Sequence, residues 1–274
     1  RMAHHSVSRA DDGTFWVPSR VHHLEVVDRV PMMRPPFYED QVLQVSEDGK
    51  VLKTISLLEV FYKNDMLGAL FANGVRIPAN ADPDMLHTND AQVLKADVAS
   101  AFPMFETGDL AISMRDLNLV MVIDPDTGKV KWKKTGPWLR QHDPDFLADG
   151  TISVFDNRSD GSLFGDVLGG SRIIKVDPKT NQSTIAFKRG KDQDKRRFYT
   201  HIMGKHQTLP NGNLLVTETI AGRVMEVAPD GDIVWQYVNR YDDQRTALIT
   251  SALRYPPDHF KFLGTSCKTA GETS

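Results

Sequence analysis

The sequence predicts an all-β fold, namely a β-propeller built from four-stranded antiparallel blades. A hairpin pattern recurs four times along the 274 residues, and its last three turns recur at a period of about fifty residues. No helical period separates the strands within a repeat. A β-sandwich also contains hairpins, but it has no reason to repeat its unit, so the repeat favours the propeller. We expect a single domain over residues 1–274 with five or six blades, part of the ring preceding residue 1.

Each predicted blade begins with two inner strands joined at a glycine turn and ends with an outer hairpin. Asp-Gly, Asn-Gly and Asp-Pro pairs shape the turns, and apolar residues alternate in the flanking strands. The inner strands meet at the turns of segments 11–20, 107–116, 148–157 and 210–219. The outer hairpins occupy segments 41–55, 119–134, 172–187 and 223–237.

Two segments do not follow the repeat. Residues 56–84 contain the run "LLEVFYKNDMLGALFANG", whose apolar spacing is helix-like, so we expect an inserted loop or helical segment over one mouth of the propeller. Residues 246–274 contain no complete unit, and we expect them to close the ring or to pack beneath it.

Composition excludes several classes of protein. The formal net charge is −3 and no basic stripe is interleaved with aromatic residues, so nucleic acid is not an expected partner. The single cysteine, Cys267, excludes an intrachain disulfide and a cysteine-based zinc site. No run of eighteen apolar residues is present, so we expect no membrane span within this chain. Nothing in the sequence indicates an oligomeric state.

Four of the nine histidines enter the first strand of a predicted blade. His5 precedes Gly13 by eight residues, as His142 precedes Gly150. His87 enters the second blade, and His206 enters the fourth at an offset two residues later than His5 and His142. An even offset keeps a strand residue on the same face, and the first strands of a propeller line its central channel. We therefore expect four imidazoles to converge near one axis.

Other polar residues fall near these histidines. Asn89 lies two residues after His87, while Arg115 and Arg158 end strands near the predicted channel mouth. Arginine beside histidine suits a sulfate- or phosphate-like group, because the guanidinium binds such oxyanions with a bidentate fork. Asp143 and Asp156 are expected to orient an imidazole or to serve in turns and salt bridges. The remaining histidines are expected to be structural, with His201 close enough to support His206: His4, His22, His23, His201 and His259.

Two other functions fit the same residues. The four histidines His5, His87, His142 and His206 could bind a divalent metal, although no short His-x-His pair is present to hold it. The chain could instead be a non-catalytic binding or scaffold propeller whose channel histidines have no reaction to perform. Apart from that metal, we expect no cofactor.

Several motifs together resemble the bacterial arylsulfotransferase (aryl sulfate sulfotransferase) family. These are "LHTNDAQVL" followed by "GDLAISMR", "QHDPDFLADGTISVFDNRSDG" followed by "SRIIKVDP", "LPNGNLLVTET" followed by "GRVMEVAPDGDIVW", and the terminal "ALRYPPD". The resemblance implies a six-bladed propeller in the periplasm or another extracytoplasmic compartment. It also implies transfer of a sulfuryl group between small phenolic compounds through a sulfated histidine, without a nucleotide donor. His87, His142 and Asn89 take the positions of family channel residues.

Two positions depart from the family pattern. The family has a channel arginine just after an Asp-Gly pair, whereas Ser162 follows Asp160-Gly161 here and Arg158 is an imperfect substitute. The family's nucleophilic histidine belongs in the segment that reads "TIAGRVMEV" in this chain, residues 219–227, which contains no histidine. We therefore expect His206 or His142 to be the nucleophile if sulfuryl transfer is retained.

Overall fold

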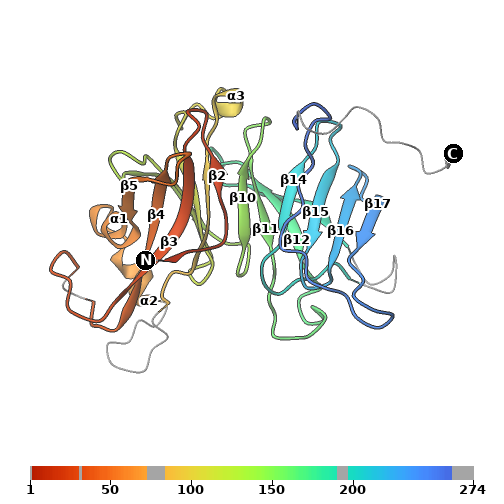
Figure 1. The fold of residues 1–274 in the computed structure, drawn as a ribbon, viewed down its shortest axis with the longest axis horizontal. Coiled ribbons are helices and arrows are strands. Elements are labelled where there is room, and N and C mark those ends of the chain that lie inside the picture. The colour runs from red at the N-terminus through yellow and green to blue at the C-terminus, as the bar shows by residue number, and fades with distance from the viewer. Residues whose placement is uncertain (1, 31–32, 73–83, 190–196, 261–274) are drawn as a thin grey trace.

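Four antiparallel sheets form the body of the protein, arranged as the blades of a β-propeller-like, all-β fold (Figure 1). The computed structural model describes residues 2–30, 33–72, 84–189 and 197–260. These residues contain four blades, one for each repeat in the sequence, and no fifth or sixth blade. Among the described residues no helix is long and apolar enough to cross a membrane.

Three of the blades have the simple up-and-down order of consecutive strands. The second blade contains β6 (Thr88–Val93), β7 (Leu110–Met114), β8 (Leu119–Ile123) and β9 (Val130–Thr135). The third contains β10 (His142–Phe146), β11 (Ile152–Asp156), β12 (Arg172–Val176) and β13 (Ser183–Lys188). The fourth contains β14 (Lys205–Thr208), β15 (Leu214–Glu218), β16 (Arg223–Val227) and β17 (Ile233–Val238).

The first blade differs because its innermost strand is divided. Both β1 (Met2–Ala3) and β2 (Ser8–Arg9) pair with the long strand β3 (Phe15–His23), which is followed by β4 (Phe37–Val45) and β5 (Val51–Ser56). His5 lies in the gap between β1 and β2 rather than on a strand, and its backbone has a φ of 66°. A left-handed residue cannot continue a strand, so the chain bends there.

Glycine occupies most of the hairpin turns because the backbone there has a positive φ. At Gly150 the φ is 78°, and a Cβ atom would lie 2.8 Å from the carbonyl oxygen of Ala101. Any other residue would strain the turn and collide with the neighbouring loop. The β10–β11 hairpin therefore needs glycine for its conformation and for its packing.

Apolar residues from adjacent blades meet to form the core. The interface between the third and fourth blades contains Phe155, Ile173, Val216 and Met225, all fully buried. Similar clusters join the first blade to the second and the second to the third. The second and third blades therefore pack against a neighbouring blade on both faces, which explains why their strands β7, β8 and β11 are buried along their whole length.

The segment predicted to be inserted contains two short helices, α1 (Leu57–Lys63) and α2 (Leu67–Ala72). The side chain of Ser56 caps α1 by accepting a hydrogen bond from the backbone N–H of Glu59. Helix α1 contacts β4 and β5, and its apolar side chains belong to the core of the first and second blades. It is thus part of the interior and not a cover over a mouth, while residues 73–83 lie outside the described residues. A third helix, α3 (Ala96–Ala99), follows β6.

The C-terminal segment lies across the fourth blade. The backbone N–H of Ala252 donates to Thr217 Oγ1, and Arg254 exchanges two hydrogen bonds with the side chain of Gln207. Ile249 and Ala252 pack on an apolar cluster of this blade. Residues 261–274, predicted to help close the ring or pack beneath it, lie outside the described residues.

Candidate functional site

Three of the four predicted histidines lie together. The ring centroid of His5 is 5.2 Å from that of His87 and 6.3 Å from that of His142, and His4 lies 4.8 Å from His5 on the other side. His5 lies in the bend before β2, His87 directly precedes β6, and His142 is the first residue of β10. The starts of three successive blades therefore build one cluster of imidazoles, the histidine cluster, made of His5, His87 and His142.

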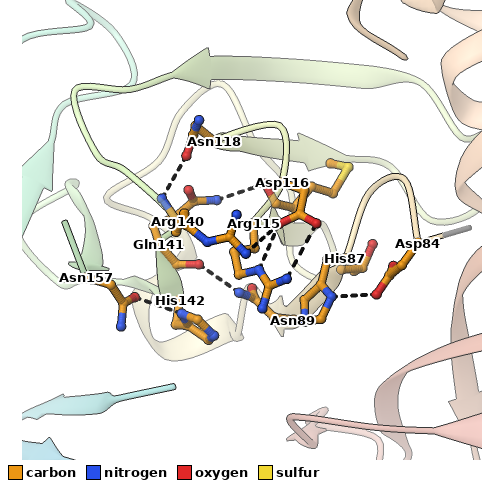
Figure 2. A network of polar contacts seen from close by, with 12 residues as sticks. Asp84, His87, Asn89, Arg115, Asp116, Asn118, Arg140, Gln141, His142 and Asn157 are labelled. Atoms are coloured by element: carbon orange, nitrogen blue, oxygen red, sulfur yellow. Dashed lines mark hydrogen bonds and ion pairs between the residues drawn. The ribbon is translucent and has the colours of Figure 1, made fainter. Parts of the chain in front are cut away.

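Within the histidine cluster, His87 is paired with a carboxylate. Its Nδ1 lies 2.6 Å from Asp84 Oδ2 (Figure 2). The same carboxylate oxygen also accepts a hydrogen bond from Arg20 Nη1 at 3.2 Å. Burial alone would raise the pKa of Asp84, but the hydrogen bond and charge of His87 and the charge of Arg20 outweigh burial and lower it. An ionised Asp84 accepts the Nδ1–H of His87 and stabilises positive charge on the ring, leaving Nε2 on the opposite edge.

His142 is paired with an amide instead. Its Nδ1 lies 2.8 Å from Asn157 Oδ1 in the buried interior of the third blade (Figure 2). Burial lowers the pKa of His142 to about 4, although the hydrogen bond to Asn157 opposes this, and the charges of Arg115 and Lys205 lower it further. His142 is therefore a neutral imidazole at neutral pH. Its partner is a group that carries no charge.

Asn89 supports His142 from the neighbouring blade. Its Nδ2 donates to the backbone carbonyl of Gln141 at 2.7 Å. The side-chain amide of Gln141 in turn donates to Ser113 Oγ and to the carbonyls of Met114 and Leu119, all in the second blade. The second blade thereby holds Gln141, the residue that precedes His142. The hydrogen bond from Asn89 thus helps to fix the backbone next to His142.

The two predicted arginines have different surroundings. Arg115 lies next to the histidine cluster: its backbone N–H donates to the carbonyl of His87 at 3.1 Å, and its guanidinium is held by Asp116 at 2.8 Å. Its charge lowers the pKa of His142. Arg158, by contrast, directs Nη1 toward Gly169 in the loop after β11, and its backbone N–H donates to Leu139 and Asp156.

His206 does not join the histidine cluster, and the reason is a β-bulge. His142 pairs with Phe155, five residues after Gly150, whereas His206 pairs with Val216, four residues after Gly212. The register of β10 shifts between His142 and Asp145, while β14 has no shift. The bulge adds one residue to β10. The two-residue offset between His142 and His206 in the sequence therefore becomes a one-residue offset in strand register. Because side chains alternate along a strand, His206 projects from the face of its blade opposite to the one that His142 occupies.

A second polar cluster surrounds His206. Its ring lies against Phe155, its Nδ1 is 2.9 Å from Asp143 Oδ2, and its Nε2 is 2.7 Å from Ser153 Oγ. Burial would lower the pKa of His206, but the hydrogen bond and charge of Asp143 outweigh burial and raise it. Nε2 is hydrogen-bonded to Ser153, Nδ1 lies at ion-pair distance from Asp143, and the side chain is fully buried. His206 is thus a member of an internal ionic network.

Lys205 occupies the register position that sequence analysis assigned to His206. It pairs with Thr217, five residues after Gly212, and its Nζ lies 2.7 Å from Asp90 and 2.6 Å from Asp143. Asp143 thus forms the salt bridge predicted for it. Proximity to these carboxylates outweighs burial and raises the pKa of Lys205, so the ammonium stays charged.

Metal-binding geometry is found at this second cluster. Asp143, Asp145 and His206 each bring a possible metal-ligand atom to within 4.8 Å of the others. Among the described residues, no other group of three histidine, cysteine or acidic side chains does so. The ligand set predicted from sequence, His5, His87, His142 and His206, is not brought together as one group. Lys205 already supplies a positive charge to Asp143, which lowers the affinity of this position for a cation.

Asp84, Asn157 and Lys205 were not predicted from the sequence. Asn157 is the last residue of the motif "SVFDN" and follows Asp156, which was expected to orient an imidazole or to serve in a turn. Asp156 instead accepts a hydrogen bond from the backbone of Leu139 and pairs with Arg172. The other histidines make local contacts. His22 stacks on Tyr38, His23 bonds to Glu39, His201 lies near Tyr199 and His259 stacks on Tyr255.

Several solved structures are similar to this chain at low identity. Virginiamycin B lyase from Staphylococcus aureus is 11% identical, with a TM-score of 0.42, over 83% of this chain and 53% of that one. A protein of unknown function from Bacteroides caccae is 14% identical, with a TM-score of 0.44, over 92% and 66%. This chain therefore spans between half and two thirds of the length of these two proteins. A search of curated proteins finds no match.

A family model gives the assignment. The model described as Arylsulfotransferase (ASST) matches residues 1–240, which include all four blades and both polar clusters. The match covers most of the chain. This chain belongs to the arylsulfotransferase family.

Proposed function

We propose that this protein transfers a sulfuryl group from an aryl sulfate to a phenolic acceptor, with His142 as the nucleophile. The observation that carries the proposal is the environment of His142: a neutral imidazole, hydrogen-bonded through Nδ1 to Asn157, within the histidine cluster. A neutral imidazole nitrogen is a competent nucleophile near neutral pH and leaves readily from an N–S bond. His206 is less suited to this role because its side chain is fully buried and its Nε2 is hydrogen-bonded to Ser153.

In the first half-reaction Nε2 of His142 attacks the sulfur of the donor. The N–S bond forms as the bond between sulfur and the phenolic oxygen breaks, and the phenolate leaves. His87, whose positive charge Asp84 stabilises, donates a proton to that phenolate. In the second half-reaction neutral His87 removes the proton of the acceptor phenol, which attacks the sulfur and releases His142. Protons and sulfuryl groups balance over the cycle, and no cofactor is used.

Arg115 and His5 are proposed to bind the sulfuryl oxygens. Asp116 holds the Arg115 guanidinium beside the cluster, and the exposed His5 ring lies 5.2 Å from that of His87 and 6.3 Å from that of His142. Donors fixed in place before the reaction stabilise the charge that develops on the oxygens in the transition state. Asn89 is proposed to contribute by holding Gln141, and Arg158 to contact the part of the substrate that extends toward the loop after β11.

A chromogenic aryl sulfate tests this function. With 4-nitrophenyl sulfate and phenol as acceptor, we expect release of nitrophenolate and formation of phenyl sulfate. His142→Ala should lower kcat/KM by about 1,000-fold or more, as expected for loss of a nucleophile. His259→Ala, which changes an exposed histidine outside both clusters, should retain activity. If a folded protein releases no phenol from any aryl sulfate, the chain is a binding or scaffold propeller instead.

We further propose an extracytoplasmic location for the protein, since family membership favours it. A reaction that needs no nucleotide donor can proceed outside the cytoplasm, where such donors are absent. Fractionation of cells that make the native protein tests the location, and recovery in the cytoplasmic fraction alone would contradict it.

A further inference from the structure

We infer that Asn157 is a positioning residue that holds His142 in the tautomer with hydrogen on Nδ1, which makes Nε2 the reactive nitrogen. The effect of this tautomer on catalysis rests on the proposed function. The assignment of the tautomer itself rests only on the hydrogen bonds of Asn157. Asn157 is fully buried, and its Oδ1 lies 2.8 Å from His142 Nδ1.

The orientation of the Asn157 amide is determined by its other contacts. Nδ2 lies 2.8 Å from the carbonyl oxygen of Thr200 and 2.7 Å from that of Met203. A carbonyl can only accept a hydrogen bond, so both contacts require the amide nitrogen on that side. If the amide were rotated, Oδ1 would face two carbonyl oxygens and Nδ2 would face His142. The oxygen of Asn157 must therefore point at the histidine.

The tautomer of His142 follows from this orientation. An amide oxygen cannot donate, so the hydrogen between the two residues belongs to His142 Nδ1. In a neutral imidazole only one nitrogen carries hydrogen, so Nε2 holds the lone pair. His87 has a carboxylate partner, Asp84, that stabilises a charged ring. The amide of Asn157 carries no charge and offers no such stabilisation. We therefore assign the role of neutral nucleophile to His142 and the role of proton donor to His87.

The segment that holds Asn157 connects the third and fourth blades. Thr200 and Met203 precede β14, and Ser171 Oγ donates to the carbonyl of Asn157 at 2.9 Å and accepts from the backbone N–H of Thr200 at 3.1 Å. Gly204 brings this segment close, because a Cβ there would lie 2.5 Å from the ring of Phe155. The fourth blade thus sets the tautomer of a histidine on the third.

Nitrogen NMR of the full chain tests the inference without any substrate. In protein labelled with ¹⁵N-histidine, the two ring nitrogens have different shifts in the two tautomers, and the signals of His142 are assigned by their loss in His142→Gln. We expect wild-type His142 at pH 7 to carry its hydrogen on Nδ1. A wild-type spectrum with the hydrogen on Nε2 would overturn the inference, whatever the activity.

Two variants test the role of Asn157 itself. Asn157→Ala should give a mixture of His142 tautomers and lower kcat at least about 10-fold with little change in KM, since binding groups are untouched. Asn157→Asp should raise the pKa of His142 and shift the acid limb of the kcat profile upward, because a carboxylate favours the charged ring. Ser171→Ala, the matched control, weakens the same segment without touching His142 and should leave the tautomer unchanged.

These outcomes separate the inference from the proposed function. If the Nδ1 tautomer is present and is lost in Asn157→Ala while no variant or wild type transfers sulfuryl groups, the positioning role stands and the proposed function falls. If Asn157→Ala folds and keeps a pure Nδ1 tautomer, the positioning role falls even though sulfotransfer is observed.

Discussion

At the scale of single residues, the site depends on the partner that each histidine has. His87 faces a carboxylate, His142 faces an amide, and His206 is enclosed by Asp143 and Ser153. The same side chain therefore has three different surroundings in three places. Sequence spacing predicted that His5, His87 and His142 would meet, but the partners come from residues distant in sequence, such as Asn157, and spacing does not reveal them.

The stability of the protein should depend on pH through His142. Its pKa is about 4 in the folded protein and about 6.5 when the chain is unfolded, so the unfolded state binds more protons between these values. We expect the contribution of neutral His142 to be complete above pH 6.5 and to fall by on the order of 3 kcal/mol as the pH drops to 4. Urea denaturation at several pH values should show a decline in stability that is larger in wild type than in His142→Gln by about this amount, because His4 and His5, whose pKa values are also lowered, remain in both proteins. Parallel pH profiles for the two proteins would contradict it.

At the scale of elements, the hairpins were predictable and the bulge was not. Turn residues and alternation place the strands of each blade close to where they occur, because these signals are local. The extra residue near Asp143, whose φ is 55°, shifts the register of His142 by one, so His142 and His206 do not occupy equivalent faces of their blades. Nothing in "QHDPDF" distinguishes a bulged strand from a regular one, although the proline is compatible with both. Because of this single local irregularity, Lys205 and not His206 is the register equivalent of His142.

Lys205 should be important for stability because its ion pairs join β6, β10 and β14 of three blades. Removing the ammonium would leave Asp90 and Asp143 buried without their partner. We expect Lys205→Met to lower the free energy of unfolding by about 3–5 kcal/mol. Arg9→Met, which breaks the exposed pair with Glu47, should cost less than about 1 kcal/mol. Equal costs for the two variants, measured by denaturant unfolding, would contradict this role.

At the scale of the whole molecule, four blades are joined through interfaces that also build the site. The histidine cluster uses the first three blades, and Asn157 ties His142 to the fourth. The four repeats found in the sequence correspond to the four described blades, because each repeat contains a full set of strands, whereas the expected fifth or sixth blade is not among the described residues. It did not predict the place of α1 in the core, since an amphipathic helix can cover a mouth or fill an interface equally well.

The C-terminal segment should stabilise the fourth blade by covering part of its apolar surface. Ile249 and Ala252 pack on Leu215 and Val224, and Arg254 pairs with Glu226. Removal of residues 246–274 should expose this surface, lower the melting temperature by several degrees and increase binding of an apolar dye. The double variant Gln244→Ala/Asp243→Ala, in the exposed turn before the segment, is the control and should melt like wild type. An unchanged melting temperature after truncation would show that the segment adds no stability.

The central claim, that His142 is the nucleophile, is tested most directly by locating the sulfuryl group on the enzyme. The protein is mixed with an aryl sulfate without acceptor, quenched at alkaline pH and digested with trypsin. Cleavage after Arg140 and Arg158 gives a peptide whose only histidine is His142, and His87 and His206 fall in other peptides. The account predicts one added SO₃ group on the His142 peptide, lost when phenol is supplied. A sulfated peptide that contains His206 or His87, with the His142 peptide unmodified, would contradict it.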